Sequence, residues 1–276
     1  MRIDAHQHFW KYNSKEYPWI GEDRIRRDFL PPELAAEQAK VHFDGSVAVE
    51  ARASIEESRW LLELAEANPK VYGVVGWVDL LSPDVETQLA RFAPNPKFAG
   101  VRYGLQGEED DRFALRPAFL NGISKLSKFG LAFDLLIVPK QLPAAIELVK
   151  QFPRQPFVVD HMAKPLIKAG TIEPWAGHMR ELAAMPNVSC KVSGLVTEAD
   201  WRHWRPEDFV PYLDVVAGAF GEDRLMIGSD WPVCLIAASY EQVTSLATSY
   251  LEKRFSPAAL RKISGENAVR FYKLKP

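Results

Sequence analysis

Eight short apolar runs recur along this chain at a nearly constant interval, and this repeat constrains the fold more than any other feature. The runs are rich in β-branched and aromatic residues and begin near Ile3, Val47, Val74, Gly100, Ala132, Phe157, Ser189 and Leu225. Their mean separation of about 32 residues is the size of a strand with its crossover helix. Eight such units predict an α/β fold, the (β/α)8 TIM barrel, whose usual length is about 250 residues.

The segments between the runs carry helix signals. Ser54 and Glu57 have the spacing of a capping box ahead of the apolar stripe that begins at Trp60. A chain of 276 residues is long enough for one large core or two small ones, but no linker, low-complexity stretch or change of composition divides it. We therefore expect one barrel domain over residues 1–276.

Two connections are longer than usual, and both contain aromatic residues. They span residues 10–45 and 195–224. Both are expected to follow the carboxyl ends of strands, where barrel enzymes build their sites. We interpret them as lid-like loops, although packing of each tryptophan against the barrel rim is a close alternative.

Three strand ends carry groups able to do chemistry. His6 and His8 lie two residues apart in the first strand, so they share a face, with about 6.6–7 Å between them along the strand. Such a pair suits metal binding or polarisation of a substrate oxygen; the structural alternative is a hydrogen-bonded pair that helps close the barrel. Asp230 ends the eighth strand, two residues after Gly228, which leaves room for a water. It suits a general base or a metal ligand, against a loop-bracing or capping role.

The sixth strand ends in Asp160 and His161, and strand alternation allows only one of them to face the interior. We favour His161, because an imidazole nearer the strand end exchanges protons near neutral pH. Lys164 follows on the loop, placed either to hold a substrate oxygen or to remain solvated.

Four charged residues interrupt the apolar runs of other strands: Glu50, Arg102, Asp134 and Lys191. A charge in a strand that is buried on both faces is costly unless it is paired. These residues either pair with one another or contact substrate hydroxyls, and the sequence leaves both readings open. Trp10, Trp77 and Trp231 are candidate faces for the ring of a substrate.

The four blocks around these residues resemble the amidohydrolase superfamily. They are the HxH motif at His6 and His8, the segment Asp160–Pro165, the segment Cys190–Leu195 and the segment Gly228–Pro232, followed by a closing segment at 265–272. They are most similar to the branch of sugar lactonases that includes L-fuconolactonase and L-rhamnonolactonase. The resemblance covers essentially the whole chain. It implies hydrolysis of a sugar-acid lactone to the free aldonic acid, in sugar catabolism.

The chain also departs from the superfamily pattern. Binuclear members use a bridging lysine on the fourth strand and a histidine on the fifth, whereas this chain has Arg102 and no histidine between His42 and His161. This departure predicts at most one divalent metal, zinc being favoured by the nitrogen-rich set His6, His8, His161 and Asp230. Catalysis without metal is equally compatible with the resemblance.

The mechanism we expect uses Asp230 to deprotonate the attacking water. His6 and His8, with Arg102 or a metal, would stabilise the oxyanion, and His161 or protonated Asp230 would protonate the leaving alkoxide. Lys164, Asp134, Glu50 and Lys191 would bind sugar hydroxyls. Two alternatives are a metal-dependent, non-hydrolytic decarboxylase on the same scaffold and a non-catalytic barrel that binds sugar acids.

Charge and hydropathy exclude other classes of partner. The chain has 34 Lys and Arg against 36 Asp and Glu, a net charge of −2, which argues against nucleic acid. No stretch approaches the roughly 20 apolar residues of a membrane span, and the first residues do not form a signal-peptide core. We expect a cytoplasmic enzyme for a small-molecule substrate, able to form a homo-oligomer.

Overall fold

Eight parallel strands in sequential order form the centre of the molecule. The computed structural model describes residues 1–276. The strands are β1 (Ile3–Gln7), β2 (Gly45–Val49), β3 (Val71–Gly76), β4 (Phe98–Tyr103), β5 (Ala132–Leu135), β6 (Phe157–Val159), β7 (Val188–Val192) and β8 (Leu225–Ile227). Each expected run begins within three residues of the first residue of the corresponding strand. β1 and β8 meet just above their ends, where the His8 amide donates to the Trp231 carbonyl at 2.7 Å. The (β/α)8 prediction is confirmed.

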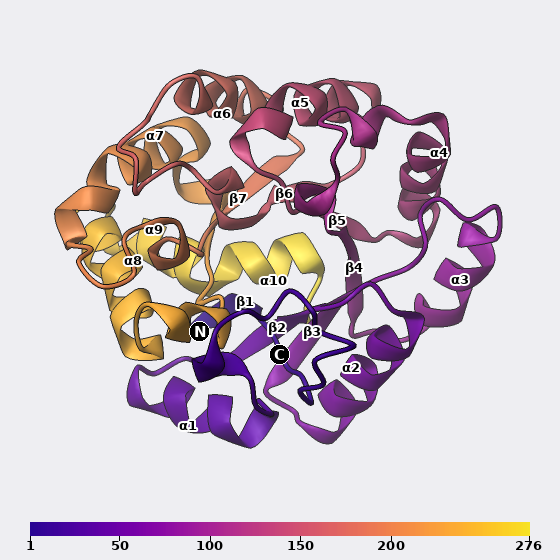
Figure 1. Cartoon of the computed structure of the whole chain (residues 1–276), viewed down its shortest axis with the longest axis horizontal. Helices are drawn as coiled ribbons and strands as arrows, with labels where there is room; N and C mark the ends of the chain where they lie inside the picture. Colours follow the sequence, from indigo (N-terminus) through magenta and orange to yellow (C-terminus); the bar gives the residue numbers. More distant parts are fainter.

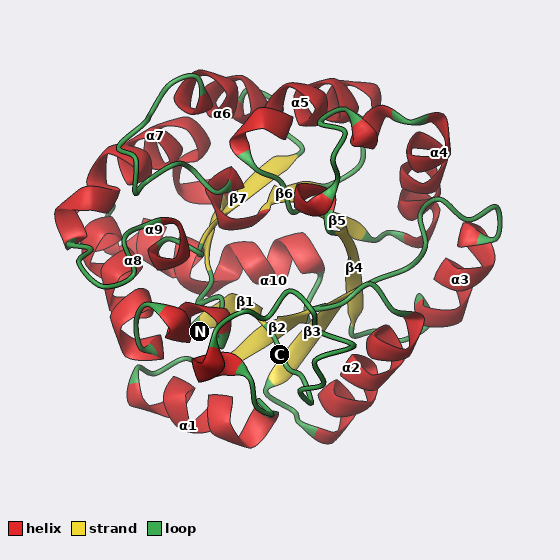
Figure 2. Ribbon diagram, viewed as in Figure 1, coloured by secondary structure: helices red, strands yellow, loops and turns green.

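Helices surround the strands (Figures 1 and 2). They are α1 (Pro31–Lys40), α2 (Ile55–Ala67), α3 (Val85–Phe92), α4 (Pro117–Leu126), α5 (Leu142–Gln151), α6 (Trp175–Ala183), α7 (Pro206–Arg224), α8 (Tyr240–Arg254), α9 (Pro257–Arg261) and α10 (Asn267–Tyr272). The Ser54 hydroxyl caps α2 by accepting from the Glu56 and Glu57 amides. Glu57 does not complete the expected box, because its carboxylate accepts from the Ala51 amide instead. None of the helices is long and apolar enough to cross a membrane.

The last helix lies across the end of the barrel opposite the strand ends that carry the chemistry. In Figure 1, α10 crosses the centre of the ring of strands. Asn267 donates to the carbonyl of Leu225 at the start of β8, at 2.8 Å. Ala268, Tyr272 and Leu274 join the apolar layer that fills the lower interior, with Ile3 of β1 among its members. The C-terminal segment therefore closes the bottom of the barrel.

Parts of both long connections are helical. Residues 10–45 contain α1, and residues 195–224 contain α7, so the irregular stretches are shorter than the sequence predicted. Residues 19–22 and 25 of the first and 197, 198 and 201 of the second line the cavity at the carboxyl ends of the strands. The lid-like role of these two stretches remains a prediction.

Candidate active site

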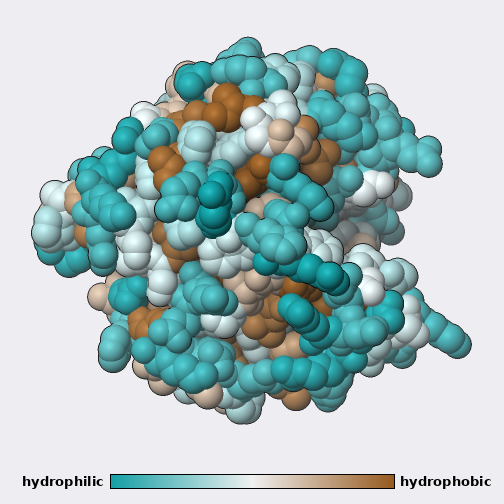
Figure 3. Space-filling model, turned by 60° about the vertical axis from the view of Figure 1, so that its left-hand side comes forward, coloured by the Kyte–Doolittle hydropathy of each residue, from teal (hydrophilic) through white to brown (hydrophobic).

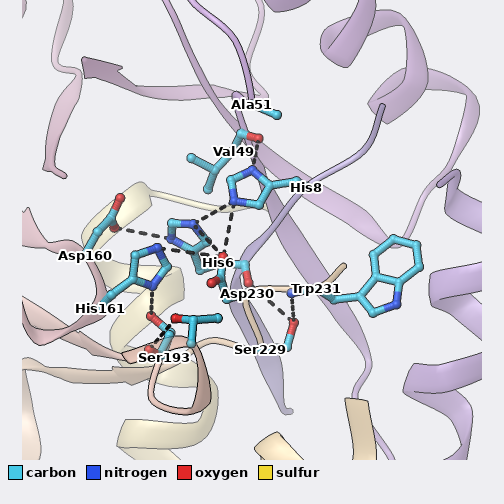
Figure 4. Close-up of polar contacts among 12 residues, drawn as sticks. His6, His8, Val49, Ala51, Asp160, His161, Ser193, Ser229, Asp230 and Trp231 are labelled. Carbon is cyan, nitrogen blue, oxygen red and sulfur yellow. Dashed lines mark hydrogen bonds and ion pairs between the residues drawn. The ribbon is translucent and has the colours of Figure 1, made fainter. Parts of the chain in front are cut away.

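Three imidazoles converge on one carboxylate at the carboxyl ends of the strands (Figure 4). The Nε2 atoms of His6, His8 and His161 lie 3.8, 3.4 and 3.7 Å from Oδ1 of Asp230. All four residues are 4% exposed or less. The barrel therefore brings these four predicted site residues together at one end.

The backbone that presents these groups is strained. β6 ends at Val159, and His161, Met162, Ala163 and Lys164 all have positive φ, as does Asp230. Left-handed conformations in residues other than glycine cost about 1 kcal/mol or more each and concentrate at functional sites. The chain therefore leaves β6 in a tight left-handed turn rather than as an extended strand.

This turn overturns one expectation from the sequence. Strand alternation would let only one of Asp160 and His161 face the interior, but both do, because the strand has already ended. Asp160 Oδ1 lies 3.3 Å from His6 Nδ1, and the ring centroids of His161 and His6 are 4.3 Å apart.

Two glycines make room for the imidazoles. A Cβ on Gly228 would lie 2.7 Å from the Cβ of His6, and one on Gly194 would lie 2.6 Å from Cγ of His161. The space that we assigned to a water beneath Asp230 is therefore filled by His6. Between Asp4 and Gln7 of β1, two residues oppose one in β2, a bulge of the kind that redirects a side chain.

The outer nitrogen of each imidazole has a partner. His8 Nδ1 lies 2.8 Å from the Val49 carbonyl and His161 Nδ1 lies 2.9 Å from the Ser193 hydroxyl. Because a carbonyl only accepts, His8 donates from Nδ1, and in neutral His8 the lone pair on Nε2 faces the Asp230 carboxylate. Two facing acceptors require a proton or a cation between them.

Burial dominates the electrostatics of the centre. Desolvation lowers the pKa of His161 to about 4, despite the opposing effect of Asp230 and Asp160. It also holds the pKa of His6 well below its usual value. Burial alone would raise the pKa of Asp230, but His161, His8 and His6 keep it below its usual range. At neutral pH the centre thus holds an ionised Asp230 beside the neutral imidazoles of His6 and His161.

These residues fit a metal ion. Ligating atoms of His6, His161 and Asp230 all lie within 4.8 Å of one another. Zinc bonds of about 2.0–2.1 Å in a tetrahedron place ligand atoms roughly 3.3 Å apart, close to the distances found here. Outer-nitrogen hydrogen bonds that orient the rings are typical of metal ligands. The donor set therefore allows one divalent metal.

The comparison with known proteins agrees with this geometry. A family model described as an amidohydrolase matches residues 3–274. The chain belongs to the amidohydrolase family. This amidohydrolase is 40% identical to an L-fucono-1,5-lactonase of Burkholderia multivorans, over 99% of this chain and 96% of that protein. It is 26% identical to an L-rhamnono-gamma-lactonase of Scheffersomyces stipitis, over 63% of this chain and 59% of that protein.

Solved structures show the same likeness. A crystal structure of an amidohydrolase from Burkholderia multivorans with bound zinc is 40% identical to this chain, with a TM-score of 0.96 and both chains covered in full. A second structure from the same organism, with bound HEPES, is 40% identical with a TM-score of 0.95, again covering both chains in full. The family resemblance inferred from the motifs is confirmed.

The amidohydrolase has a cavity of about 550 Å³ above this cluster, a size typical of small-molecule sites. Several residues predicted to bind substrate line it: Glu50, Trp77, Arg102 and Lys164, together with His8, His161 and Asp230. His6 lies behind Asp230 and is not part of the wall. A larger groove, of about 670 Å³ between α7 and α8, contains none of the predicted site residues.

Four residues predicted to contact substrate do not line the cavity. Asp134 and Lys191 are fully buried below the cavity, where Lys191 Nζ pairs with Asp134 Oδ2 at 2.6 Å. Trp10 and Trp231 are also buried. Both tryptophans pack against Phe29, because the chain after β1 turns back and brings this residue between them.

The cavity wall also contains two tryptophans of the lid-like loops, and the site contains two residues, Ser193 and Glu198, that sequence reasoning did not single out. Trp19 and Trp201 lie at its mouth and are 47% and 41% exposed. Glu198 lies 3.4 Å from Lys164. Ser193 carried a usable signal, since it follows Lys191 by two residues and so shares its face. Glu198 ends a single 3-10 turn (Val196–Glu198) and the two tryptophans lie in turns, where no strand or helix periodicity indicates direction.

Proposed function

We propose that this protein hydrolyses a sugar-acid lactone to the free aldonic acid, as a step in sugar catabolism. The observation that carries the proposal is the convergence of three imidazoles on Asp230 at the floor of the cavity. The 40% identical L-fucono-1,5-lactonase supports it, and L-fucono-1,5-lactone is the first substrate to test. The near-full-length match to a lactonase does not favour the decarboxylase alternative.

Asp230 is the base in this reaction. It is ionised at neutral pH and lies at the cavity wall, so it can take a proton from a water that attacks the lactone carbonyl. His161 is neutral and lies 3.7 Å from Asp230, so it can take over the proton that Asp230 removed from the water and pass it to the ring oxygen as that oxygen leaves. Positioned proton transfer of this kind contributes about 10²–10⁴ in rate.

Arg102 supplies positive charge beside the reacting carbonyl. Its Nε donates to Glu50 Oε1 at 2.8 Å, a second NH donates to the Glu50 carbonyl, and Nη1 lies 3.3 Å from His6 Nε2. A guanidinium held on several sides is preorganised, which is what stabilisation of an oxyanion requires. Glu50 and Lys164 are placed to bind sugar hydroxyls, and Trp77 offers a face for the sugar ring.

One divalent ion belongs to the proposed centre. His6, His8, His161 and Asp230 would hold it, and it would polarise the lactone carbonyl and acidify a water. With His161 as a ligand, protonated Asp230 would give the proton to the leaving oxygen. The convergence of three imidazole nitrogens on one carboxylate oxygen, at 3.4–3.8 Å, favours this arrangement.

A screen of aldonolactones with a pH indicator tests the function. The panel contains L-fucono-1,5-lactone, L-rhamnono-gamma-lactone, their stereoisomers and a lactone without hydroxyls, each with and without a chelator. We expect acid release from the sugar lactones, faster than from the plain lactone, and loss of activity after chelation that zinc restores. No acceleration with any lactone would contradict the proposal, and undiminished turnover in chelator would remove the metal from it.

A further inference from the structure

The barrel interior directly below the cavity is filled by a buried ion cluster. Lys191 of β7 and Asp134 of β5 are fully buried, as is Asp160 at the end of β6. Lys191 Nζ lies 2.6 Å from Asp134 Oδ2 and 2.9 Å from Asp160 Oδ1. TIM barrels usually fill this layer with branched apolar side chains, so the ion cluster needs an explanation.

Lys191 connects this cluster to the reaction centre. Its ammonium has three NH groups, and a third partner, His6 Nδ1, lies 3.1 Å away. Asp160 contacts the same imidazole at 3.3 Å, and its other oxygen lies 3.4 Å from Arg102 Nη1. The two cavity-facing groups Arg102 and Asp230 are thus connected to Lys191 through one shared layer of side chains.

The C-terminal helix extends this connection to the bottom of the barrel. The Tyr272 hydroxyl of α10 lies 2.9 and 2.8 Å from the two carboxylate oxygens of Asp134, and Tyr272 is 3% exposed. A continuous series of contacts therefore runs from Tyr272 through Asp134 and Lys191 to His6. It spans the interior from the closed end to the site.

Stability alone does not account for this cluster. Taking charges out of water is costly, and apolar residues of similar volume often replace buried ion pairs with no loss of stability. What the ion pair adds is a fixed position for its partners, because each charge is held by several directional contacts. The partner that matters for chemistry is His6, which lies behind Asp230.

We propose that Lys191, Asp134 and Tyr272 are positioning residues, which hold Asp160 and the His6 imidazole against Asp230 and so make the C-terminal helix part of the reaction centre. This inference rests on the proposed lactone hydrolysis. None of the three residues lines the cavity, so each acts through its neighbours. Their loss should slow turnover without weakening substrate binding.

A paired substitution separates positioning from structural support. Asp134→Leu combined with Lys191→Met removes both charges together, so no unpaired charge is left in the interior. We expect a folded protein whose kcat falls by about 10–100-fold, the range found for residues that orient metal ligands, with KM within about twofold. A folded double variant with the kcat of the wild type would overturn the proposal.

Tyr272→Phe is the milder variant, and it decides the question if the double variant does not fold. It removes one hydroxyl and leaves the Asp134–Lys191 pair intact. Tyr212→Phe is its matched control, because Tyr212 is also buried and its hydroxyl lies 3.2 Å from a backbone carbonyl, that of Leu166, away from the site. We expect a fall in kcat of about threefold or more for Tyr272→Phe alone, toward the lower end of such effects. Equal kcat in the two variants would contradict the positioning role.

A binding measurement keeps this test independent of the substrate. Competition of each metal-free protein with a chromophoric chelator gives its zinc affinity. We expect affinity to fall by about 10–100-fold in the double variant and to remain unchanged in Tyr212→Phe. If the wild-type protein binds zinc but hydrolyses no lactone, the proposed function is wrong. The zinc affinities of the variants would still test the positioning role. Equal affinity in wild type and double variant would overturn it.

Discussion

Asp230 is the side chain on which the proposed reaction depends most. Asp230→Asn keeps the size of the side chain but removes its charge and its ability to take a proton. We expect kcat for lactone hydrolysis to fall by about 10²–10⁴, the usual contribution of a general base. Steady-state kinetics on L-fucono-1,5-lactone give this ratio, and circular dichroism shows whether the variant is folded. A folded variant with nearly normal kcat would exclude Asp230 as the base.

His161 makes stability depend on pH. Its pKa falls from 6.5 in the unfolded chain to about 4 in the fold, mainly because burial disfavours the cation. Between these values the unfolded chain binds a proton that the folded protein does not, so stability falls as the pH is lowered from 6.5 to 4. For one group this amounts to about 3 kcal/mol.

Thermal melts of metal-free protein at pH 4.5, 5.5, 6.5 and 7.5 measure this effect. Tm should fall on the acid side in the wild type and fall less steeply in His161→Asn, which carries no titrating group. Identical pH profiles for the two proteins would show that His161 does not titrate as described.

At the scale of elements, the repeat of apolar runs predicted every strand, because a strand buried on both faces has a distinctive composition. Residues that leave the regular geometry could not be predicted. The left-handed turn at 160–164 brings Asp160 inward, and the bulge in β1 sets the direction of His6. Both depend on contacts between strands that are distant in sequence, so local periodicity does not report them.

The tryptophans illustrate the same limit. Trp10 and Trp77 both follow strands, yet Trp10 is fully buried with its indole NH on the Arg27 carbonyl, whereas Trp77 lines the cavity. The difference arises because the chain after Trp10 folds back through Phe29. Residue type and spacing alone did not distinguish the two positions.

A pair of substitutions tests these assignments. Trp77→Leu should raise KM about fivefold, the loss of about 1 kcal/mol of ring contact, with little change in Tm. Trp10→Leu should instead lower Tm by about 5 °C or more, because it leaves a void in the aromatic cluster. Kinetics and melting curves on both variants check this. The reverse pattern would mean that Trp10 faces the substrate.

At the scale of the whole molecule, the net charge of −2 does not indicate that the barrel contains a charged centre. Four buried carboxylates, Glu50, Asp134, Asp160 and Asp230, surround two buried cations, Arg102 and Lys191. Elsewhere the surface is mixed, and the side in Figure 3 is mainly hydrophilic with separate hydrophobic patches. Within this group of six residues the carboxylates outnumber the cations by two, which equals the charge of one divalent cation.

This balance predicts stabilisation by zinc. An ion that binds only the folded state at about 100 times its Kd adds about 2.7 kcal/mol, which raises Tm by several degrees in a chain of this size. Melting curves of the metal-free protein with increasing Zn²⁺ measure the effect, with Asp230→Asn as the variant in which it should shrink. Absence of any shift in the wild type would contradict a metal site at this centre.

The most direct test of the account is hydrolysis of L-fucono-1,5-lactone in water enriched in oxygen-18. Attack of an activated water on the lactone carbonyl predicts rapid formation of the aldonic acid with one heavy oxygen, located in its carboxylate, and a rate that falls together with kcat in Asp230→Asn. Mass spectrometry of the product measures both the position of the heavy oxygen and the rate of its incorporation. A label in a hydroxyl group, or a rate no greater than that of the lactone in buffer, would contradict the account.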